Sequence, residues 1–229
     1  TKLFREERER PVLLVVDQRP GMFFGSSNCF KSVLAAHLAS LLCWSALDGG
    51  DRVGGLVFDG QQHREVRPRR SRRTVLGLLS EVCAFNSALP LATPAPPDSF
   101  ANMLANLRRV AKPGSNIYLV SDFSGADDDN ARKHLFQLAQ HTQITAINCS
   151  DPLESQLPHG GRYAVTDGEA RSELNTGDQR LRREYRDAFT RLQDSLQTNF
   201  ARLGIPLLQA STTNPPFTLL QTYYGDSRR

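Results

Sequence analysis

Two aspartates, Asp17 and Asp122, are the residues of this sequence best placed to do chemistry. Each ends a run of apolar residues, "PVLLVVD" at 11–17 and "SNIYLVSD" at 115–122. Such runs are typical of strands that are buried on both faces of a parallel sheet. Ligands of such sheets bind at the carboxyl ends of the strands, near the point where strand order reverses. If the two strands are neighbours, the two carboxylates converge on one crevice and form a candidate site.

The segments around these strands alternate between strand and helix patterns. This alternation predicts an α/β fold with a mostly parallel central sheet, helices on its faces and small antiparallel hairpins. Asp59-Gly60 and Asp167-Gly168 are the expected hairpin turns. The expected strands lie at 11–17, 51–60, 61–68, 115–122, 143–151 and 205–211, with a hairpin at 161–175. The expected helices lie at 30–47, 72–85, 98–110, 127–140, about 178–203 and 215–225.

No set of nucleophile, base and metal ligand accompanies the two aspartates. Ser26, Ser121 and Ser124 stand in no GxSxG motif and have no evident base nearby in the sequence. The five histidines form no HxxH, HxH or HExxH motif, so we expect structural roles for them. "DGGDRVGG" at 48–55 lies between a helix and a strand, whereas a phosphate-binding loop requires the reverse order. The sequence therefore predicts that the protein is not an enzyme.

The composition favours a cytoplasmic protein without a membrane span. No apolar run approaches the roughly 18 residues that a membrane span requires, and the pattern of a signal peptide is absent. The four cysteines form no CxxC pair, which predicts buried, reduced thiols. They are Cys29, Cys43, Cys83 and Cys149.

Positive charge is concentrated in one segment. The net charge is +4, and "REVRPRRSRR" at 64–73 contains six arginines. The segment lacks the interleaved aromatic residues that bind single-stranded nucleic acid, so we expect no nucleic-acid partner. Two interpretations remain open, namely a solvated hairpin tip and a contact with an acidic partner protein.

Five short motifs give the chain a resemblance to a known bacterial family. They are "FREERER" (4–10), "DGGDRVGGLVF" (48–58), "VSDF" (120–123), "DP...LP..G" (151–160) and "TDGE" (166–169). With these motifs the chain resembles the family catalogued as domain of unknown function fifty-eight, which is von Willebrand A-like. The resemblance covers essentially the whole chain. It implies a Rossmann-like von Willebrand A-type fold over residues 1–229, as a single domain. The chain opens mid-pattern at "TKLFREERER" without an initiator Met, so we expect it to be the C-terminal part of a longer protein.

The resemblance also has implications for function and for a metal site. Members of this family are typically encoded beside MoxR-type AAA+ ATPases, which implies a cofactor-independent binding module that works with such an ATPase in protein assembly or maturation. Von Willebrand A domains hold Mg²⁺ at a metal-ion-dependent adhesion site, built from Asp-x-Ser-x-Ser, a loop Thr and a later Asp. The matching positions in this sequence are Asp17, Arg19, Gly21, Asp98 or Ser99, and Asp122.

Arg19 and Gly21 replace the two serine ligands of that site. Mg²⁺ prefers near-octahedral oxygen ligands at about 2.0–2.1 Å, and the fixed charge of an arginine repels it. Three interpretations remain open. Arg19 lies between Asp17 and Asp122 as a salt bridge that replaces the ion, or it points to solvent while the acids cap backbone amides, or the acids bind a cation. We expect the first, and therefore no cofactor, with Mg²⁺ as the alternative.

The loops around this crevice predict where a partner binds. Aromatic residues on loops are common interface anchors, and Phe23 and Phe24 stand in the loop "GMFFGS". Acidic residues at the start of the helix after Asp122 form a candidate rim for a basic segment of the partner. The alternatives are that the aromatic rings pack as core and that the acids complement the helix dipole. The rim residues are Asp127, Asp128 and Asp129.

Two classes of function follow. The favoured one is a non-enzymatic protein-interaction module with a degenerate metal-ion-dependent adhesion site. The alternative is a metal-dependent hydrolase or phosphatase that uses Asp17 and Asp122. "DQRPG" at 17–21 does not resemble the nucleophile turn of such enzymes, which favours the interaction module.

Overall fold

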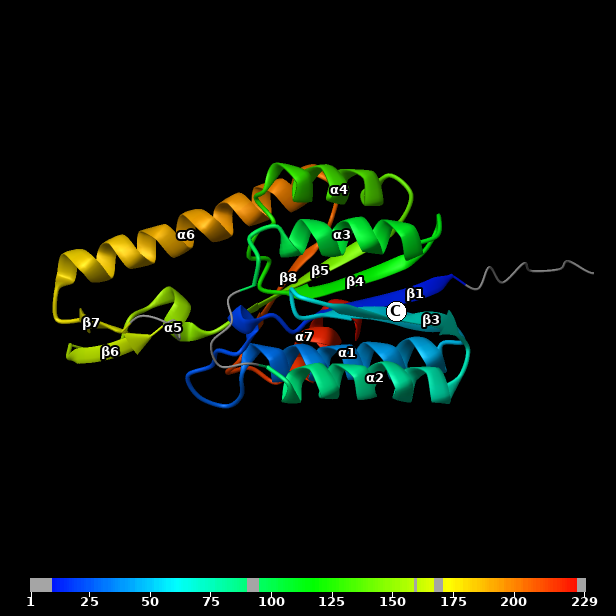
Figure 1. Ribbon diagram of the computed structural model, residues 1–229, viewed down its shortest axis with the longest axis horizontal. Coiled ribbons are helices and arrows are strands. Elements are labelled where there is room, and N and C mark those ends of the chain that lie inside the picture. The colour runs from blue at the N-terminus through cyan, green and yellow to red at the C-terminus, as the bar shows by residue number, and fades with distance from the viewer. Residues whose placement is uncertain (1–9, 90–94, 159, 167–170, 226–229) are drawn as a thin grey trace, which may run out of the picture.

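A six-stranded sheet crosses the molecule, and a separate two-stranded hairpin lies to one side of it (Figure 1). The computed structural model describes residues 10–89, 95–158, 160–166 and 171–225. The strands are β1 (Pro11–Asp17), β2 (Arg52–Phe58), β3 (His63–Arg69), β4 (Asn116–Ser121), β5 (Gln143–Ser150), β6 (Arg162–Thr166), β7 (Arg171–Asn175) and β8 (Leu207–Ser211).

The main sheet has the order β3-β2-β1-β4-β5-β8. Its strands are parallel except for β3, which forms an edge and runs antiparallel to β2. The strands β1 and β4 lie side by side in the middle, with Val16 opposite Val120. The chain winds outward in opposite directions from these two strands, so their carboxyl ends flank the reversal point where such sheets bind ligands.

Helices cover both faces of the sheet. They are η1 (Pro20–Met22), α1 (Lys31–Asp48), α2 (Arg72–Ser87), α3 (Ser99–Val110), α4 (Asp129–Ala139), α5 (Pro152–Ser155), α6 (Gln179–Arg202) and α7 (Pro216–Tyr224). One apolar core packs α1 and α2 against one face, and a second packs α3, α4 and the end of α6 against the other. Because each central strand faces a core on both sides, its sequence is a continuous apolar run.

The observed elements confirm the predicted α/β fold with a mostly parallel central sheet, flanking helices and small antiparallel hairpins. The expected hairpin turn at Asp59-Gly60 is present. Asp59 Oδ1 accepts hydrogen bonds of 2.9 Å from the backbone N–H groups of Gln61 and Gln62, and Gly60 adopts a φ of 95° that favours glycine. The hairpin β6–β7 is also present, while its expected turn at Asp167-Gly168 lies outside the described residues. The short helix α5 was not predicted, because four residues carry no helical periodicity.

The prediction of buried cysteines is only partly correct. Cys43 and Cys149 are fully buried, whereas Cys29 is half-buried and Cys83 is exposed. The helix α2 buries the face that contains Val82, and the next residue is rotated about 100° away from that face. The prediction was therefore wrong for Cys83, which lies inside an apolar run but points outward.

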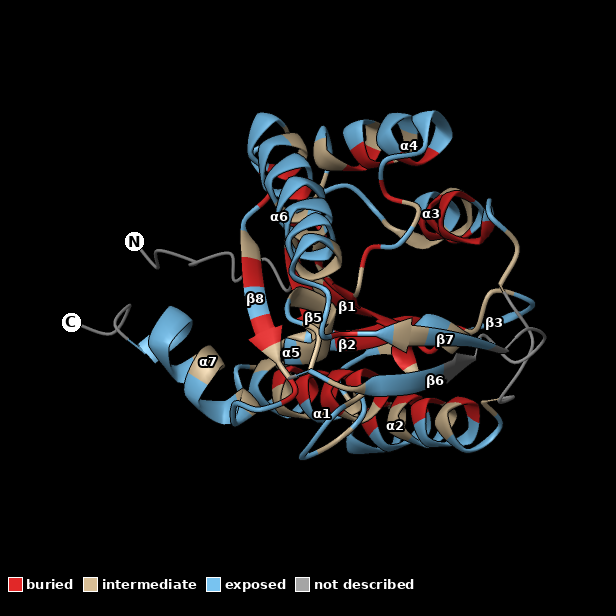
Figure 2. Ribbon diagram, turned by 90° about the vertical axis from the view of Figure 1, so that its left-hand side faces the viewer, coloured by how far each residue is buried: buried red, intermediate tan, exposed pale blue. Residues whose placement is uncertain are grey.

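The helix α6 extends beyond the sheet. Only Leu196 and Phe200, near its C-terminal end, are buried in the core. Its first half reaches past the carboxyl end of the sheet, above the hairpin β6–β7, and is largely exposed (Figures 1 and 2). Within the described parts of the chain, no helix combines the length and apolarity needed to cross a membrane.

Candidate functional site

The adjacent strands β1 and β4 bring two aspartates to the same edge of the sheet. Asp17 is the last residue of β1 and is fully buried, while Asp122 follows β4 directly and keeps 14% of its side chain exposed. Ser121 lies between them and donates a hydrogen bond of 2.6 Å from Oγ to Asp17 Oδ2. The two carboxylates thus face one crevice.

Arg19 lies between these carboxylates. Its Nη2 atom is 2.7 Å from Asp17 Oδ2 and 3.5 Å from Asp122 Oδ1, and its Nε atom is 3.0 Å from both carboxylate oxygens of Asp17. The guanidinium carbon lies 5.5 Å from the ring centre of Phe58 and 5.3 Å from that of Phe100, distances at which aromatic rings stabilise cations. Arg19 is therefore a buried member of the site, and it does not point to solvent.

The backbone after β4 turns in a conformation that is unusual for its residue type. Phe123 has a φ of 56°, in the left-handed region that residues with bulky side chains rarely adopt. The turn lets Ser124 N–H donate to Asp122 Oδ1 at 3.0 Å, and it directs the Ser124 carbonyl to Arg19 Nη1 at 2.9 Å. Edge-to-face contacts of the buried Phe123 ring with Phe100 and Phe200 hold this turn in place.

A second buried cation, Lys31, was not identified from the sequence. It is the first residue of α1, and only 2% of its side chain is exposed. Its Nζ atom lies 2.6 Å from Glu154 Oε1 and 3.1 Å from Asp122 Oδ2. The sequence held a weak signal, because Lys31 is one of only four lysines and opens a strongly apolar helix. Nothing in the sequence indicated its partners.

The charges in this cluster stabilise one another. Burial by itself would raise the pKa of the Asp122 carboxyl, but the Lys31 ammonium and the Arg19 guanidinium lower that pKa below its ordinary value. Burial by itself would lower the pKa of the Lys31 ammonium, but Asp122 and Glu154 raise it above its ordinary value. Near neutral pH Asp122 is therefore ionised and Lys31 is protonated, so that opposite charges lie next to each other.

Asp151 extends the cluster toward β8. Its carboxylate accepts hydrogen bonds from the hydroxyl of Thr212 and from the backbone N–H groups of Ser26 and Leu153. These donors lower the pKa of Asp151, although burial by itself would raise it. Its backbone N–H donates to Glu154 Oε2 at 2.8 Å. Asp151 therefore ties the loop after β1 and the turn after β8 to the same edge of the sheet.

The remaining residues expected at a metal site divide into two groups. Ser99 Oγ lies 3.4 Å from Arg19 Nη1, at the edge of the cluster. Gly21 is also close, since a Cβ atom added there would lie 3.1 Å from Asp122 Oδ2. Asp98 is exposed and accepts a hydrogen bond from the side chain of Asn102, so it does not contact the cluster.

The loop after β1 presents an aromatic surface next to the crevice. Phe24 is 40% exposed, whereas Phe23 is half-buried and stacks on Phe30 with ring centres 4.4 Å apart. Met22, from the same segment, is buried in the core. The loop therefore contributes one anchored ring and one free ring.

The three acids at the start of α4 have different environments. Asp128 caps the helix by accepting hydrogen bonds from the backbone N–H groups of Asn130 and Ala131. Asp129 pairs with Arg132 at 2.6 Å on the exposed surface. Asp127 is exposed and lines the hollow beside Asp122. Local helix stabilisation thus accounts for Asp128 and Asp129, and only Asp127 faces the site.

The residues at this site do not fit a Mg²⁺ ion. Asp17 and Asp122 already contact two cationic side chains, and a divalent ion next to Arg19 and Lys31 would be strongly repelled. The positions of the two serine ligands hold Arg19 and Gly21, which offer no side-chain oxygen. Among the described residues, no group of three or more His, Cys, Asp or Glu side chains is arranged to hold a metal ion.

The arrangement of these side chains is also unsuited to nucleophilic or acid–base catalysis. Asp17 is shielded from solvent by Arg19 and Ser121. The Ser121 hydroxyl donates to Asp17 Oδ2, which already contacts Arg19, so both groups are held in the ion-pair network. Cys149 is fully buried beside this cluster, and burial raises its pKa far above the ordinary range of a thiol. The arrangement is therefore a largely buried network of ion pairs.

Comparisons with known proteins agree with this fold. A family model described as "Protein of unknown function DUF58" matches residues 1–195. An uncharacterized protein of Mycobacterium tuberculosis is 26% identical over 224 residues, which span 97% of this chain and 69% of that protein.

Two solved structures also resemble this chain. The conserved hypothetical protein BatB from Bacteroides thetaiotaomicron has a TM-score of 0.56 at 13% identity, covering 96% of this chain and 98% of that one. An aerotolerance-related membrane protein from Bacteroides fragilis has a TM-score of 0.53 at 14% identity, covering 93% and 97%. At these identities the structural likeness shows the fold alone.

Proposed function

We propose, because the chain belongs to the DUF58 family, that it is a non-enzymatic protein-interaction domain with a degenerate metal-ion-dependent adhesion site. The observation that carries this proposal is the cluster of buried ion pairs at the strand tips. Arg19 and Lys31 together supply two positive charges where a von Willebrand A domain of the metal-binding kind holds a divalent ion. The carboxylates of Asp17 and Asp122 are thereby stabilised by cationic side chains in place of a metal. Neither carboxylate is left free to act as an acid or a base.

The proposed partner is a MoxR-type AAA+ ATPase, with a role in protein assembly or maturation. This proposal rests on the resemblance noted from the sequence motifs. Because such an ATPase requires ATP, the proposed partner favours a cytoplasmic location for the domain.

The surface proposed to contact the partner is the crevice at the strand tips. Phe24 offers an exposed ring there, and the preceding residue Phe23 stacks on Phe30. Asp127 offers an exposed carboxylate in the hollow beside Asp122. An aromatic anchor beside a rigid charged cluster is typical of the energetic centre of a protein interface.

A reconstitution experiment tests this function. The chain is immobilised and exposed to the purified MoxR-type ATPase of the same genome, in ATP, in ADP and without nucleotide. We expect capture that depends on the nucleotide, because AAA+ ATPases change conformation between these states. The variant Phe24→Ala with Asp127→Lys should abolish capture while its circular dichroism spectrum stays unchanged. Asp128 is left intact because its carboxylate caps α4.

The matched control changes the other charged surface of the molecule. The variant Arg64→Glu with Arg67→Glu alters two exposed positions on the edge strand β3. It should leave capture intact. Capture that is lost only in this control would move the interface to the arginine-rich hairpin. Absence of capture by the unaltered chain in every nucleotide state would refute the proposed partner.

A further inference from the structure

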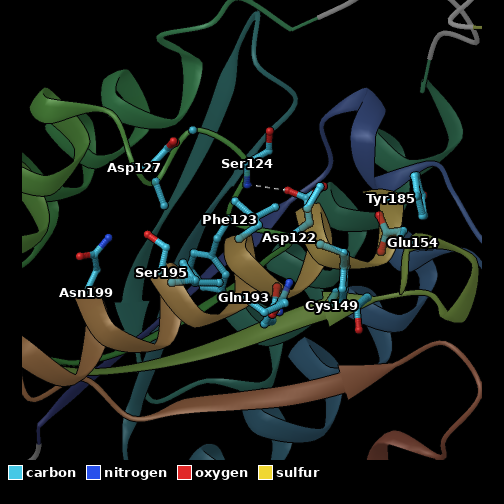
Figure 3. A pocket seen from close by; sticks show the side chains of 18 residues that line it. Asp122, Phe123, Ser124, Asp127, Cys149, Glu154, Tyr185, Gln193, Ser195 and Asn199 are labelled. Carbon is cyan, nitrogen blue, oxygen red and sulfur yellow. Dashed lines mark hydrogen bonds between the residues drawn. The ribbon is translucent and has the colours of Figure 1, made fainter. Parts of the chain in front are cut away.

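A groove of about 500 Å³ lies beside the charged cluster, between the carboxyl ends of β4 and β5 and the projecting helix α6 (Figure 3). One end is marked by Asp127 and Asn199, and the other by Tyr185 and Glu154. The Tyr185 hydroxyl donates a hydrogen bond of 3.1 Å to the carbonyl of Leu153, which joins α6 to α5 at that end.

One face of α6 forms a wall of this groove. Its lining residues recur at spacings of three and four from Tyr185 to Asn199, so they follow a single stripe of the helix. This stripe is about 21 Å long at 1.5 Å per residue. Leu192 lies in its middle and is 56% exposed, although it belongs to the face that is turned toward the sheet. The wall therefore presents apolar surface that no described part of the chain covers.

The ionisable side chains that line the groove are mainly acidic. Among the described residues, its lining contains Asp122, Asp127 and Glu154 but no Lys, Arg or His, although the chain as a whole has a net charge of +4. The compensating cations Arg19 and Lys31 are buried, whereas the carboxylates of Asp122 and Glu154 are more exposed at 14% and 27%. The groove thus presents acidic oxygens to solvent beside an apolar wall.

We propose that this groove binds a short segment of a partner protein in which apolar side chains alternate with lysine or arginine. The apolar side chains cover Leu192 and its neighbours, and a cation meets the exposed carboxylate of Asp127 at one end. A stripe of about 21 Å accommodates about six residues of an extended chain. This inference rests on the proposed interaction function and specifies the chemistry of the partner segment.

A peptide selection tests the inference without knowledge of the partner. A phage-displayed library of random peptides is selected on the unaltered chain and counter-selected on the Leu192→Glu variant. We expect the enriched peptides to contain leucine, isoleucine or phenylalanine beside lysine or arginine and to lack acids. The most enriched peptide is then synthesised with a fluorophore, and its affinity is measured by fluorescence anisotropy.

Matched variants locate the binding. Leu192→Glu and Asp127→Lys should each weaken binding by about tenfold or more, because each removes a direct contact. Leu76→Glu is the control for the first, since Leu76 is also an exposed helical leucine at 57% but lies on α2. Asp187→Lys is the control for the second, since Asp187 is exposed on α6 outside the groove. Both controls should bind as the unaltered chain does, and binding should weaken as salt rises.

Three results would overturn the inference. The first is that the selection enriches no peptide on the unaltered chain over the Leu192→Glu variant, and the second is that it enriches acidic peptides. The third is a dimer in sedimentation that Leu192→Glu dissociates, which would mean that a second copy fills the groove. These results are distinct from failure of the proposed function. Capture of the ATPase without peptide enrichment refutes only the groove, and peptide enrichment without capture refutes only the ATPase as partner.

Discussion

Replacing Lys31 by methionine tests the charged cluster most directly. Methionine retains an unbranched side chain of similar length, so packing is largely kept while the charge is removed. Breaking a buried ion pair by removing one partner costs about 3–5 kcal/mol, because the remaining charge is buried without compensation. Here Asp122 and Glu154 are partly exposed, and Arg19 still lies 3.5 Å from Asp122. We therefore expect a loss of about 3 kcal/mol, at the lower end of that range.

The pH dependence of this loss follows from the two perturbed groups. The pKa of Asp122 is lowered from its ordinary 3.8, so its contribution to stability is present above pH 3.8 and is lost as pH falls through the folded value. The pKa of Lys31 is raised from its ordinary 10.5, so its contribution is present below pH 10.5 and is lost as pH rises through the folded value. The stability difference between the two proteins should be largest between these limits and should shrink outside them.

The assay is urea unfolding followed by far-ultraviolet circular dichroism, with the free energy of unfolding extrapolated to water at each pH. Lys112→Met is the control, because Lys112 is exposed and surface substitutions change stability by about 0.5 kcal/mol or less. Adding Glu154→Gln to Lys31→Met should recover part of the loss, since it removes one of the uncompensated charges. A Lys31→Met variant as stable as the control at neutral pH, or a loss that does not change in acid, would refute the reasoning.

Three further predictions concern metal binding and thiol exposure. In the unaltered chain, neither EDTA nor millimolar Mg²⁺ should change the melting temperature, whereas a clear rise with Mg²⁺ would contradict the fit argued above. The triple variant Arg19→Ser, Gly21→Ser and Lys31→Met removes both cations and restores the serine ligands. It should be less stable without metal and should regain stability with Mg²⁺, and a lack of response would show that the cations do not stand in for an ion. A thiol reagent should label Cys83 rapidly in the folded protein and Cys43 only after unfolding, because burial raises the pKa of Cys43 to about 12. Mass spectrometry of the labelled chain checks this order.

Local pattern predicted much of the fold. Apolar runs and helical periodicity depend on which faces of an element are buried, and this leaves a repeating mark in neighbouring residues. The hairpin at Asp59-Gly60 could be predicted for the same reason, because a turn depends on its own residues. The exposed Cys83 marks the limit of such reasoning, since an apolar run does not state which of its members faces outward.

The charged cluster could be predicted only in part. Asp17 and Arg19 are two residues apart, and the position of Asp122 at a strand end followed from the apolar run before it. The ion pairs of Lys31 could not be predicted, because it lies 91 residues from Asp122 and 123 residues from Glu154 in the sequence. No spacing rule connects such positions.

The sequence by itself determined the alternation of strands and helices and placed two acids and one arginine at strand ends. The tertiary structure decided that β1 and β4 are neighbours, that α1 begins beside Asp122 and that α6 projects over the edge of the sheet. The physical reason is that secondary structure reflects burial along a local repeat, whereas a site reflects which distant chain ends the packing of the sheet brings within a few ångströms. Charge compensation at the site and the acidic groove beside it therefore depend on the tertiary structure.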